Sequence, residues 1–248
     1  MNNTSMIINP SREKGDPEIP ADGLLLINPA EAVAGLRLAK ERNGQQYYLY
    51  NSRLTLIPEL PPAGAFFLSG PAVGAPMAVL TLEKLIALGA RRIIVYGWCG
   101  SLNETLAIGD TLLPTWGVSD EGTSDHYLSN ETPESHAHTR QLLAEELESQ
   151  GFTVQAGPVW STDAPYRESL EQVKLLGRDG VLGGDMEFTA VVTAAAFRKV
   201  ELTAVLLVSD ELWSGKWRSG FRTKNFKKKS RNILRILANF CGESSLLP

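Results

Sequence analysis

The sequence has few cysteines and histidines, and this scarcity excludes several kinds of site. Only two cysteines occur among 248 residues, Cys99 inside an apolar segment and Cys241 near the end. Such a pair supplies neither a disulfide framework nor a four-ligand zinc site, so we expect a reducing, cytoplasmic location. The three histidines all fall within residues 125–138 and lack the carboxylate spacing of a zinc signature. We therefore expect no metal.

The sequence also lacks long apolar runs and a strong charge bias. No run reaches the roughly 18 apolar residues of a membrane-spanning helix, and Met1–Ser5 does not begin a secretory leader. The formal net charge of −4 gives no general attraction to nucleic acid. With 43% hydrophobic and 21% charged residues, the chain has the composition of an ordinary globular domain. We expect no membrane and no nucleic-acid partner.

Strand and helix patterns alternate along the chain, which is typical of a βαβ sheet. Residues 1–22 contain three prolines and predict an extended arm, whereas residues 23–248 predict one domain. The predicted elements are, in order, strand 24–27, helix 30–42, strands 47–49, 53–57 and 66–68, helix 77–88, strands 93–96 and 108–113, helix 139–150, strand 152–160, helices 168–176 and 186–197, strand 202–208 and helix 224–240. Loops are expected at 97–101, 119–133 and 161–166. The pattern predicts an α/β domain with a central mixed, twisted sheet flanked by helices.

Two acidic segments lie where this pattern predicts functional groups. Asp185 and Glu187 follow a Gly-Gly pair and suit the positive first turn of the next helix. Asp210 follows the buried strand 202–208, and ligands of open α/β sheets bind at the carboxyl ends of such strands. Asp210 is therefore a candidate reactive carboxylate. Each of these acids also has a purely structural interpretation, as a helix cap or a group that favours the helix dipole.

Four segments occur in an order that one known family shares. They are Gly97-Trp98-Cys99-Gly100-Ser101 with Ile108-Gly109-Asp110, then Ser161-Thr162-Asp163, then Asp185-Met186-Glu187, and finally Val208-Ser209-Asp210. In this respect the chain resembles the nucleoside phosphorylase and nucleosidase superfamily, which includes purine nucleoside phosphorylase and uridine phosphorylase. The resemblance covers roughly residues 66–212. It implies a three-layer phosphorylase-like fold that cleaves the N-glycosidic bond of a nucleoside, with no metal or redox cofactor and with inorganic phosphate as co-substrate in a phosphorylase.

The resemblance also implies roles for individual residues. Asp210 matches the family's acid, which protonates or hydrogen-bonds the base as the glycosidic bond breaks. Glu187 matches the carboxylate that holds the ribose hydroxyls, and Met186 the apolar residue that packs on the sugar. Asp185 stands beside them where many members have Glu. An acid at position 210 makes the chain more similar to the purine-cleaving branch.

Further predicted site residues come from loops and glycines. Asp163 and Tyr166 are expected over the base, although Asp163 could instead cap the helix that begins near Glu168. His126 and Arg53 are candidates for reaching the site of a neighbouring subunit, because family members borrow residues across subunits. The resemblance implies at least a dimer, which we expect to be a homodimer or a homohexamer.

The walls around the attacking group are expected from two glycine-rich segments, 70–74 and 97–101. Within them, Gly74, Gly97, Trp98 and Gly100 are the predicted lining of the nucleophile or phosphate pocket. For Trp98, packing in the core beside the site is the favoured interpretation over stacking on a ligand.

The phosphate site is where the sequence departs from the family pattern. The family's Gly-Asp-Pro-x-Arg loop is replaced by Asn28-Pro29-Ala30-Glu31, so an anion stands in place of a cation. A second family arginine corresponds to Val95, and a small hydroxyl residue to Trp98. A buried phosphate dianion needs several charge-assisted hydrogen bonds. Phosphorolysis ranks first, while hydrolysis by water and nucleoside binding without turnover stay open as alternatives.

Overall fold

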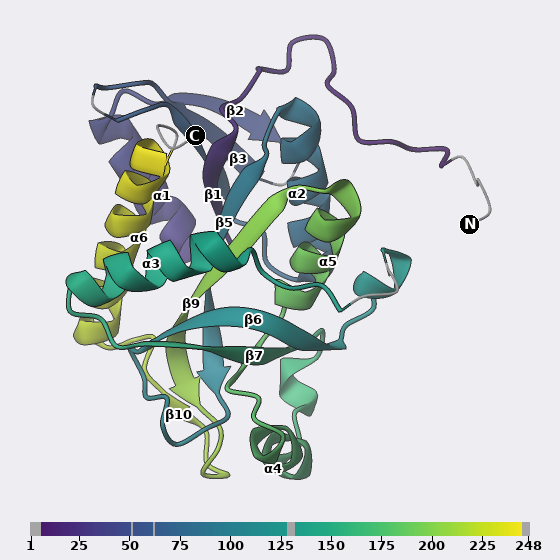
Figure 1. Cartoon of the computed structure of the whole chain (residues 1–248), viewed down its shortest axis with the longest axis vertical. Helices are drawn as coiled ribbons and strands as arrows, with labels where there is room; N and C mark the ends of the chain where they lie inside the picture. The colour runs from purple at the N-terminus through teal and green to yellow at the C-terminus, as the bar shows by residue number, and fades with distance from the viewer. Residues whose placement is uncertain (1–5, 51, 62, 128–131, 245–248) are drawn as a thin grey trace.

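The structure is a computed structural model that describes residues 6–50, 52–61, 63–127 and 132–244. One ten-stranded sheet runs through it, and helices cover the sheet on both sides (Figure 1). The α/β class and the three-layer arrangement that the sequence predicts are therefore confirmed.

The central strands of the sheet run parallel and are buried. β1 (Asp22–Leu26) pairs in parallel with β4 (Phe66–Gly70) on one side and with β5 (Arg92–Ser101) on the other. β5 pairs in parallel with β9 (Glu201–Glu211) as well. Their nearly continuous apolar sequences suit burial on both faces.

The two ends of the sheet differ in topology. At one end, β2 (Gln45–Leu49) and β3 (Ser52–Ile57) form an antiparallel hairpin beside β4, with β2 outermost. At the other end the pairing runs from β9 through β6 (Thr111–Asp120), β7 (Val154–Thr162) and β8 (Gly183–Asp185) back to β5. These five strands form a closed ring, and the short β10 (Arg218–Ser219) adds to β9.

The helices divide between the two faces. Three helices cover one face of the sheet, on the left of Figure 1: α1 (Pro29–Glu41), α3 (Ala137–Ser149) and α6 (Lys224–Ser244). Leu24 and Tyr96 of the sheet point to this face. The face that Leu25 and Val95 contribute to is covered by α2 (Ala75–Leu88) and α5 (Phe188–Arg198). α4 (Leu170–Arg178) and the 3₁₀ helices η1 (Ser124–His126) and η2 (Pro165–Arg167) complete the structure. Alternate residues of the central strands thus supply two separate core layers.

The loop predicted at 97–101 is wrong, because these residues belong to β5. Pairing with β9 continues to Ser101, and only a register shift between Cys99 and Gly100 interrupts it. The glycines that suggest a loop allow this bulge and the close approach of neighbouring chains.

The strand predicted at 108–113 begins only at Thr111. The Asp110 carboxylate accepts a hydrogen bond from the Ala107 N–H at 2.9 Å, which closes a turn in front of the strand. β6 then continues to Asp120, into the predicted loop 119–133, because it pairs in parallel with β7 over this stretch. Of that predicted loop, residues 128–131 lie outside the described residues.

The helix predicted from Met186 begins later, at Phe188. Asp185 is the last residue of β8 and therefore lies before the helix instead of in its first turn. The described part of the N-terminal arm, residues 6–21, contains no helix or strand. Lys84 of α2 holds the arm through Asp16 (2.6 Å) and the Ser11 carbonyl (2.8 Å).

Candidate active site

Glu187 lies at the start of α5 and contacts the start of α2. Its side chain is 6% exposed, and its Oε1 accepts a hydrogen bond of 2.6 Å from the Gly74 N–H. Gly74 has a φ of 86°, a conformation that L side chains rarely adopt. A substitution there would move the amide that holds the carboxylate. The glycine thus fixes the position of Glu187.

Asp185 has both carboxylate oxygens engaged within the protein. Oδ1 accepts a hydrogen bond from Ser161 Oγ at 2.5 Å, and Oδ2 accepts from the N–H groups of Glu187 (3.2 Å) and Phe188 (2.7 Å). The side chain therefore caps α5 and ties it to β7. A carboxylate used in this way positions Glu187 instead of offering a free oxygen.

Burial raises the pKa values of both carboxyls. For Asp185, hydrogen bonds from Ser161 and from the helix N–H groups oppose the effect of burial on the pKa. For Glu187, the negative charge of Asp185 adds to burial and raises the pKa further. The pair favours one shared proton, carried by Glu187. Met186, half-buried between them, is the apolar neighbour of this pair.

Asp210 lies near the end of β9, next to the other acids through β5. Gly100 of β5 pairs with Gly184 of β8 on one side and with Asp210 on the other. A Cβ atom on Gly100 would lie 3.3 Å from Asp210 Oδ2, so the glycine permits this close approach. Asp210 accepts hydrogen bonds from Ser209 Oγ at 2.6 Å and from Trp217 Nε1 at 2.8 Å. The indole N–H orients one carboxylate oxygen.

Glu168 is a neighbour of Asp210 that the sequence analysis missed. Burial, together with the negative charge of Asp210, raises the pKa of Glu168 to about 7. This carboxyl can therefore hold a proton near neutral pH. In the sequence, Glu168 is distinguished only by its place before Ser169, the N-cap of α4. That position predicts the start of a helix and does not predict a functional carboxyl.

Glu121 is a second missed acid, and it holds η1 against α5. The buried carboxylate accepts hydrogen bonds from Ser119 Oγ (2.9 Å), the Thr123 N–H (2.6 Å) and Thr189 Oγ1 (3.0 Å), and from the hydroxyl of Ser124. Burial acts to raise the pKa of Glu121, but these hydrogen bonds outweigh it and the pKa is lowered. Glu121 is thus ionised at neutral pH and holds these segments together.

The predicted base-binding residues are exposed, unlike the buried acids, although the charge of Asp163 still contributes to the raised pKa of Glu187. Asp163 is exposed and accepts a hydrogen bond of 3.1 Å from the Gly122 N–H, which joins two loops. It lines a cavity of about 840 Å³ together with His126, a residue predicted to reach across subunits. Tyr166 on η2 is 99% exposed. Arg53 is exposed on β3, with its guanidinium 5.7 Å from the centre of the Tyr48 ring.

The predicted lining of the phosphate pocket divides between two faces of the sheet. Gly74 and Gly100 lie on the side of the carboxylates, as described above. Gly97 is buried against Ile27, to which a Cβ atom would come within 3.3 Å. Trp98 packs into the opposite layer, between α1 and α6, so the structure does not bring this predicted lining residue beside the carboxylates. Val95, where the family pattern has an arginine, is 1% exposed in the core.

No helix in the described part of the chain has the length and apolarity to span a membrane. In the same part, no group of three or more histidine, cysteine, aspartate or glutamate side chains is arranged to hold a metal ion. Both cysteines are buried free thiols, and burial raises their pKa values.

Comparisons with known proteins agree with this fold. The family model of the phosphorylase superfamily matches residues 45–241. The chain belongs to this superfamily. It is 29% identical over 149 residues to the DeoD-type purine nucleoside phosphorylases of Bacillus thuringiensis (strain Al Hakam) and Bacillus mycoides (strain KBAB4). The match covers 59% of this chain and 63% of the length of each relative.

Solved structures share the fold over nearly the whole chain. A uridine phosphorylase from Vibrio fischeri ES114 superimposes with a TM-score of 0.78 at 19% identity, covering 98% of this chain and 99% of that one. A purine nucleoside phosphorylase from Toxoplasma gondii, in complex with immucillin-H, gives a TM-score of 0.79 at 20% identity, with 98% of each chain covered.

Proposed function

We propose that this protein cleaves the N-glycosidic bond of a nucleoside, with a preference for purines. The observation that carries the proposal is the arrangement of Glu187, held by the Gly74 amide at the start of α5, and Asp210, held by Trp217 on β9, with Gly100 paired both to Asp210 and to Gly184 of β8. Membership of the phosphorylase superfamily supports the same chemistry.

In the proposed mechanism the acids act on opposite ends of the nucleoside. Glu187 binds the ribose hydroxyls and Met186 packs on the sugar, so that the reacting carbon is held in place. Cleavage builds positive charge on the sugar and electron density on the departing base. Asp210 hydrogen-bonds or protonates the base, and Glu168, with a pKa of about 7, is a proton source beside it. Asp185 helps to orient Glu187 by accepting a hydrogen bond from its backbone N–H.

Phosphate is the attacking group in the first form of the proposal. Relatives that are named as phosphorylases support it. The missing cations would have to come from elsewhere. Arg53, exposed on β3, is available to a neighbouring copy, and Lys216 and Arg222 are exposed near Trp217.

Water is the attacking group in the second form, and one observation favours it. The site gathers the carboxyl groups of Glu187, Asp210 and Glu168, while Val95 occupies the position of a family arginine. A charge-assisted hydrogen bond is worth about 1.5–3 kcal/mol, so the loss of two cations weakens phosphate binding strongly. Water needs no such charge. A protein that binds nucleoside without cleaving it is the third possibility, and the same assay detects it.

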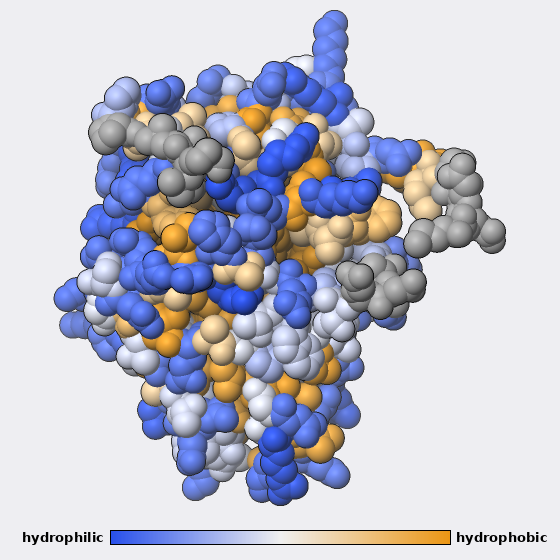
Figure 2. Space-filling view, in the orientation of Figure 1, coloured by the Kyte–Doolittle hydropathy of each residue, from blue (hydrophilic) through white to orange (hydrophobic). Residues whose placement is uncertain are grey.

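We further propose a homodimer or homohexamer in a cytoplasmic setting. Figure 2 shows apolar surface over α2 and α5, where Leu80 and Phe197 are 45% and 53% exposed. The cavity that contains His126 adjoins this surface. A second copy seated there would cover the apolar side chains and bring His126 to the partner's sugar site.

The experiment that tests the proposal is base release from purine and pyrimidine nucleosides, with and without millimolar phosphate, with identification of the sugar product. Sugar 1-phosphate formed only with phosphate establishes phosphorolysis. Free sugar formed regardless of phosphate establishes hydrolysis. Absence of base release despite measurable binding rejects the enzyme proposal in favour of a binding module.

A further inference from the structure

The charges of the chain are divided unequally along it. Of its 24 basic and 28 acidic residues, nine basic and no acidic ones lie in residues 212–242, which leaves 15 basic against 28 acidic residues elsewhere. The net charge of −4, from which we expect no nucleic-acid partner, is therefore the sum of a strongly basic segment and a more strongly acidic remainder. Net charge describes the attraction of the whole molecule and does not exclude a local basic surface.

Five of these cations form one stripe along α6, which we call the basic stripe. Their spacing of i, i+3, i+4, i+7 and i+11 places them on one helix face about 100° wide and roughly 16 Å long. The opposite face of α6 is buried in the core through residues such as Phe226 and Leu237, which fixes the stripe toward solvent. The basic stripe consists of five exposed side chains, Lys224, Lys227, Lys228, Arg231 and Arg235.

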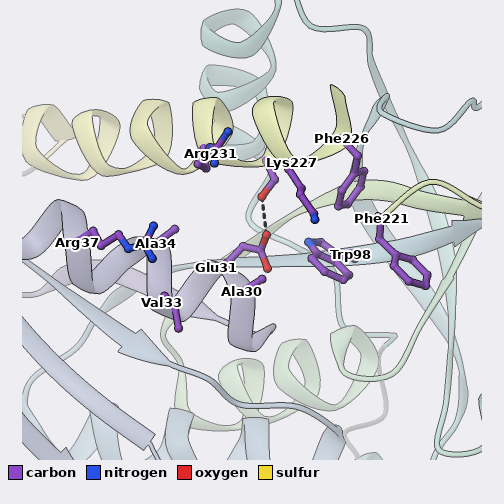
Figure 3. Close-up of a pocket in the computed structure, with 11 residues that line it drawn as sticks. Ala30, Glu31, Val33, Ala34, Arg37, Trp98, Phe221, Phe226, Lys227 and Arg231 are labelled. Carbon is purple, nitrogen blue, oxygen red and sulfur yellow. Dashed lines mark hydrogen bonds between the residues drawn. The ribbon is translucent and has the colours of Figure 1, made fainter. Parts of the chain in front are cut away.

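α1 lies beside α6 and adds a further exposed cation. A groove separates the two helices, and Figure 3 shows Arg37 of α1 and Lys227 and Arg231 of α6 along it. Glu41 of α1 lines the adjoining hollow beside Arg235. Within the part of the chain that the structure describes, neither Arg37 nor any member of the basic stripe forms an ion pair. These cations are therefore available to an anionic partner.

The lysines of α6 stand where the helix dipole disfavours them. The amino-terminal end of a helix carries a partial positive charge, so acidic side chains are stabilising there and basic ones are not. Four lysines nevertheless lie within the first six residues of α6, and no acid lies in its first turn. The fold accounts for Lys229, whose ammonium donates a hydrogen bond of 2.8 Å to the Gly109 carbonyl. The other three lysines and the helix terminus together attract an anion from outside.

An exposed aromatic side chain lies next to the amino-terminal end of the basic stripe. Trp217 is 65% exposed, and Lys216 and Arg218 flank it in the sequence. Its ring centre lies 6.1 Å from that of Phe221, which lines the same groove as Lys227. Aromatic rings beside a cationic surface are the platforms on which the bases of single-stranded nucleic acids stack.

We propose that the basic stripe of α6 binds single-stranded nucleic acid. The phosphates pair with the cations along α6, and a base stacks on Trp217 at the amino-terminal end of the stripe. An acidic peptide meets the same cations but makes no use of the exposed indole, and a duplex keeps its bases stacked inside. Binding here requires no cleavage of a nucleoside, so it can be tested whether or not the proposed enzymatic function holds.

The test is fluorescence anisotropy of a labelled oligouridylate of about 15 nucleotides titrated with the full chain. If the stripe neutralises about five phosphates, the slope of log affinity against log salt is about −3.5, so the affinity should fall about 100-fold between about 50 mM and 200 mM salt. Unlabelled duplex of the same length and polyglutamate are the comparisons, and both should compete more weakly than the unlabelled single strand.

A triple variant tests the stripe itself. Lys224→Gln with Lys228→Gln and Arg235→Gln removes three stripe cations that do not line the groove shown in Figure 3. The slope should become less negative by about 2, because each neutralised phosphate of a single strand contributes about 0.7 to it. The affinity at the lower salt concentration should fall about tenfold or more.

Two further variants separate charge from stacking. The matched control Lys14→Gln with Lys174→Gln and Arg178→Gln removes three exposed cations outside α6, and it should leave the slope and the affinity unchanged. Trp217→Ala should weaken binding about fivefold or more at both salt concentrations. Its slope should stay that of the unmodified protein, since stacking releases no counterions.

The proposal is overturned if the oligouridylate does not bind, or if the duplex or polyglutamate competes as well as the single strand. Equal competition by polyglutamate would indicate an acidic protein as the partner instead. An unchanged affinity in Trp217→Ala, or equal losses in the stripe variant and its matched control, would overturn it as well. Thermal unfolding of each variant establishes that it is folded.

Discussion

Two buried glutamates stand at the starts of helices on opposite faces of the sheet, and their surroundings differ. Glu187, before α5, receives a backbone hydrogen bond from Gly74 and is oriented by Asp185, which is itself fully hydrogen-bonded. Glu31, in the first turn of α1, accepts a hydrogen bond from the Ser230 hydroxyl, and its other oxygen is buried beside the Trp98 indole. Burial raises the pKa of both. The comparison teaches that burial alone does not define a reactive carboxylate: the supporting donors determine whether its position is fixed.

The largest effect is expected where the chemistry is proposed. Asp210→Asn keeps the size of the side chain but cannot give a proton as an acid does, so kcat should fall by about 10²–10⁴ while nucleoside binding changes little. Steady-state kinetics on the nucleoside that gives most base release measure this. Asp179→Asn, at the exposed end of α4, is the control. An unchanged kcat in Asp210→Asn would remove this residue as the acid.

Replacing Glu187 tests whether this glutamate binds the sugar of the nucleoside. Because Glu187 holds a proton near neutral pH, Glu187→Gln should weaken nucleoside binding by about 2- to 10-fold, since a hydrogen bond between uncharged groups is worth about 0.5–1.5 kcal/mol. Titration calorimetry with the nucleoside and with its free base separates the sugar contribution, because the affinity for the base should not change. Equal affinities of the variant and the unmodified protein for the nucleoside would contradict the assigned role.

Asp185 and Asp179 differ in how many donors depend on them. Asp185→Asn turns one acceptor into an amide that faces N–H groups, so the free energy of unfolding should fall by about 1–3 kcal/mol. Asp179→Asn should change it by less than about 0.5 kcal/mol. Urea unfolding at neutral pH gives both values. A loss in Asp185→Asn no larger than in the control would show that the cap of α5 is dispensable.

Glu31→Gln should instead gain stability relative to the unmodified protein as the pH rises. The folded-state pKa of Glu31 is raised by burial, so its favourable contribution is complete below the ordinary pKa of 4.5 and is lost as the pH passes the raised value. The glutamine has no such ionisation. Unfolding curves between pH 4 and pH 9 measure the difference, and a constant difference across this range would contradict the raised pKa.

The smallest effect concerns Glu168. The charge of Asp210 contributes to its pKa of about 7, so Asp210→Asn should lower that pKa toward the ordinary 4.5 without reaching it, because the effect of burial remains. Carbon-13 NMR titration of labelled glutamate carboxyls measures the shift. The same titration of Asp179→Asn should show no change, and a Glu168 pKa unaffected by Asp210→Asn would mean that the two groups do not interact.

Local patterns predicted most of the elements, because alternating strands and helices have different hydrophobic periods. The order of acidic segments likewise predicted the superfamily. The side of the sheet on which the Trp98 side chain lies could not be predicted from these patterns. Side chains alternate along a strand, so the extension of β5 through a segment predicted as a loop decided which layer received the indole.

Contacts between distant segments account for the residues that were missed. Glu168 becomes unusual only because α4 begins near the end of β9. Asp185 was predicted in a helix, whereas its pairing partners on β7 hold it in a strand. The residues next to these positions in the sequence do not indicate such contacts.

The closed ring of β5, β9, β6, β7 and β8 has a mechanical consequence. Each strand in the ring pairs with two other strands of the ring. If the hydrogen bonds to one neighbour break, the strand is still held by those to the other. The three residues of β8, too short to persist as an isolated strand, should therefore open only together with their neighbours. Amide hydrogen exchange at Gly184 should be as slow as in the centre of β5, whereas the outer strand β2 should exchange far sooner.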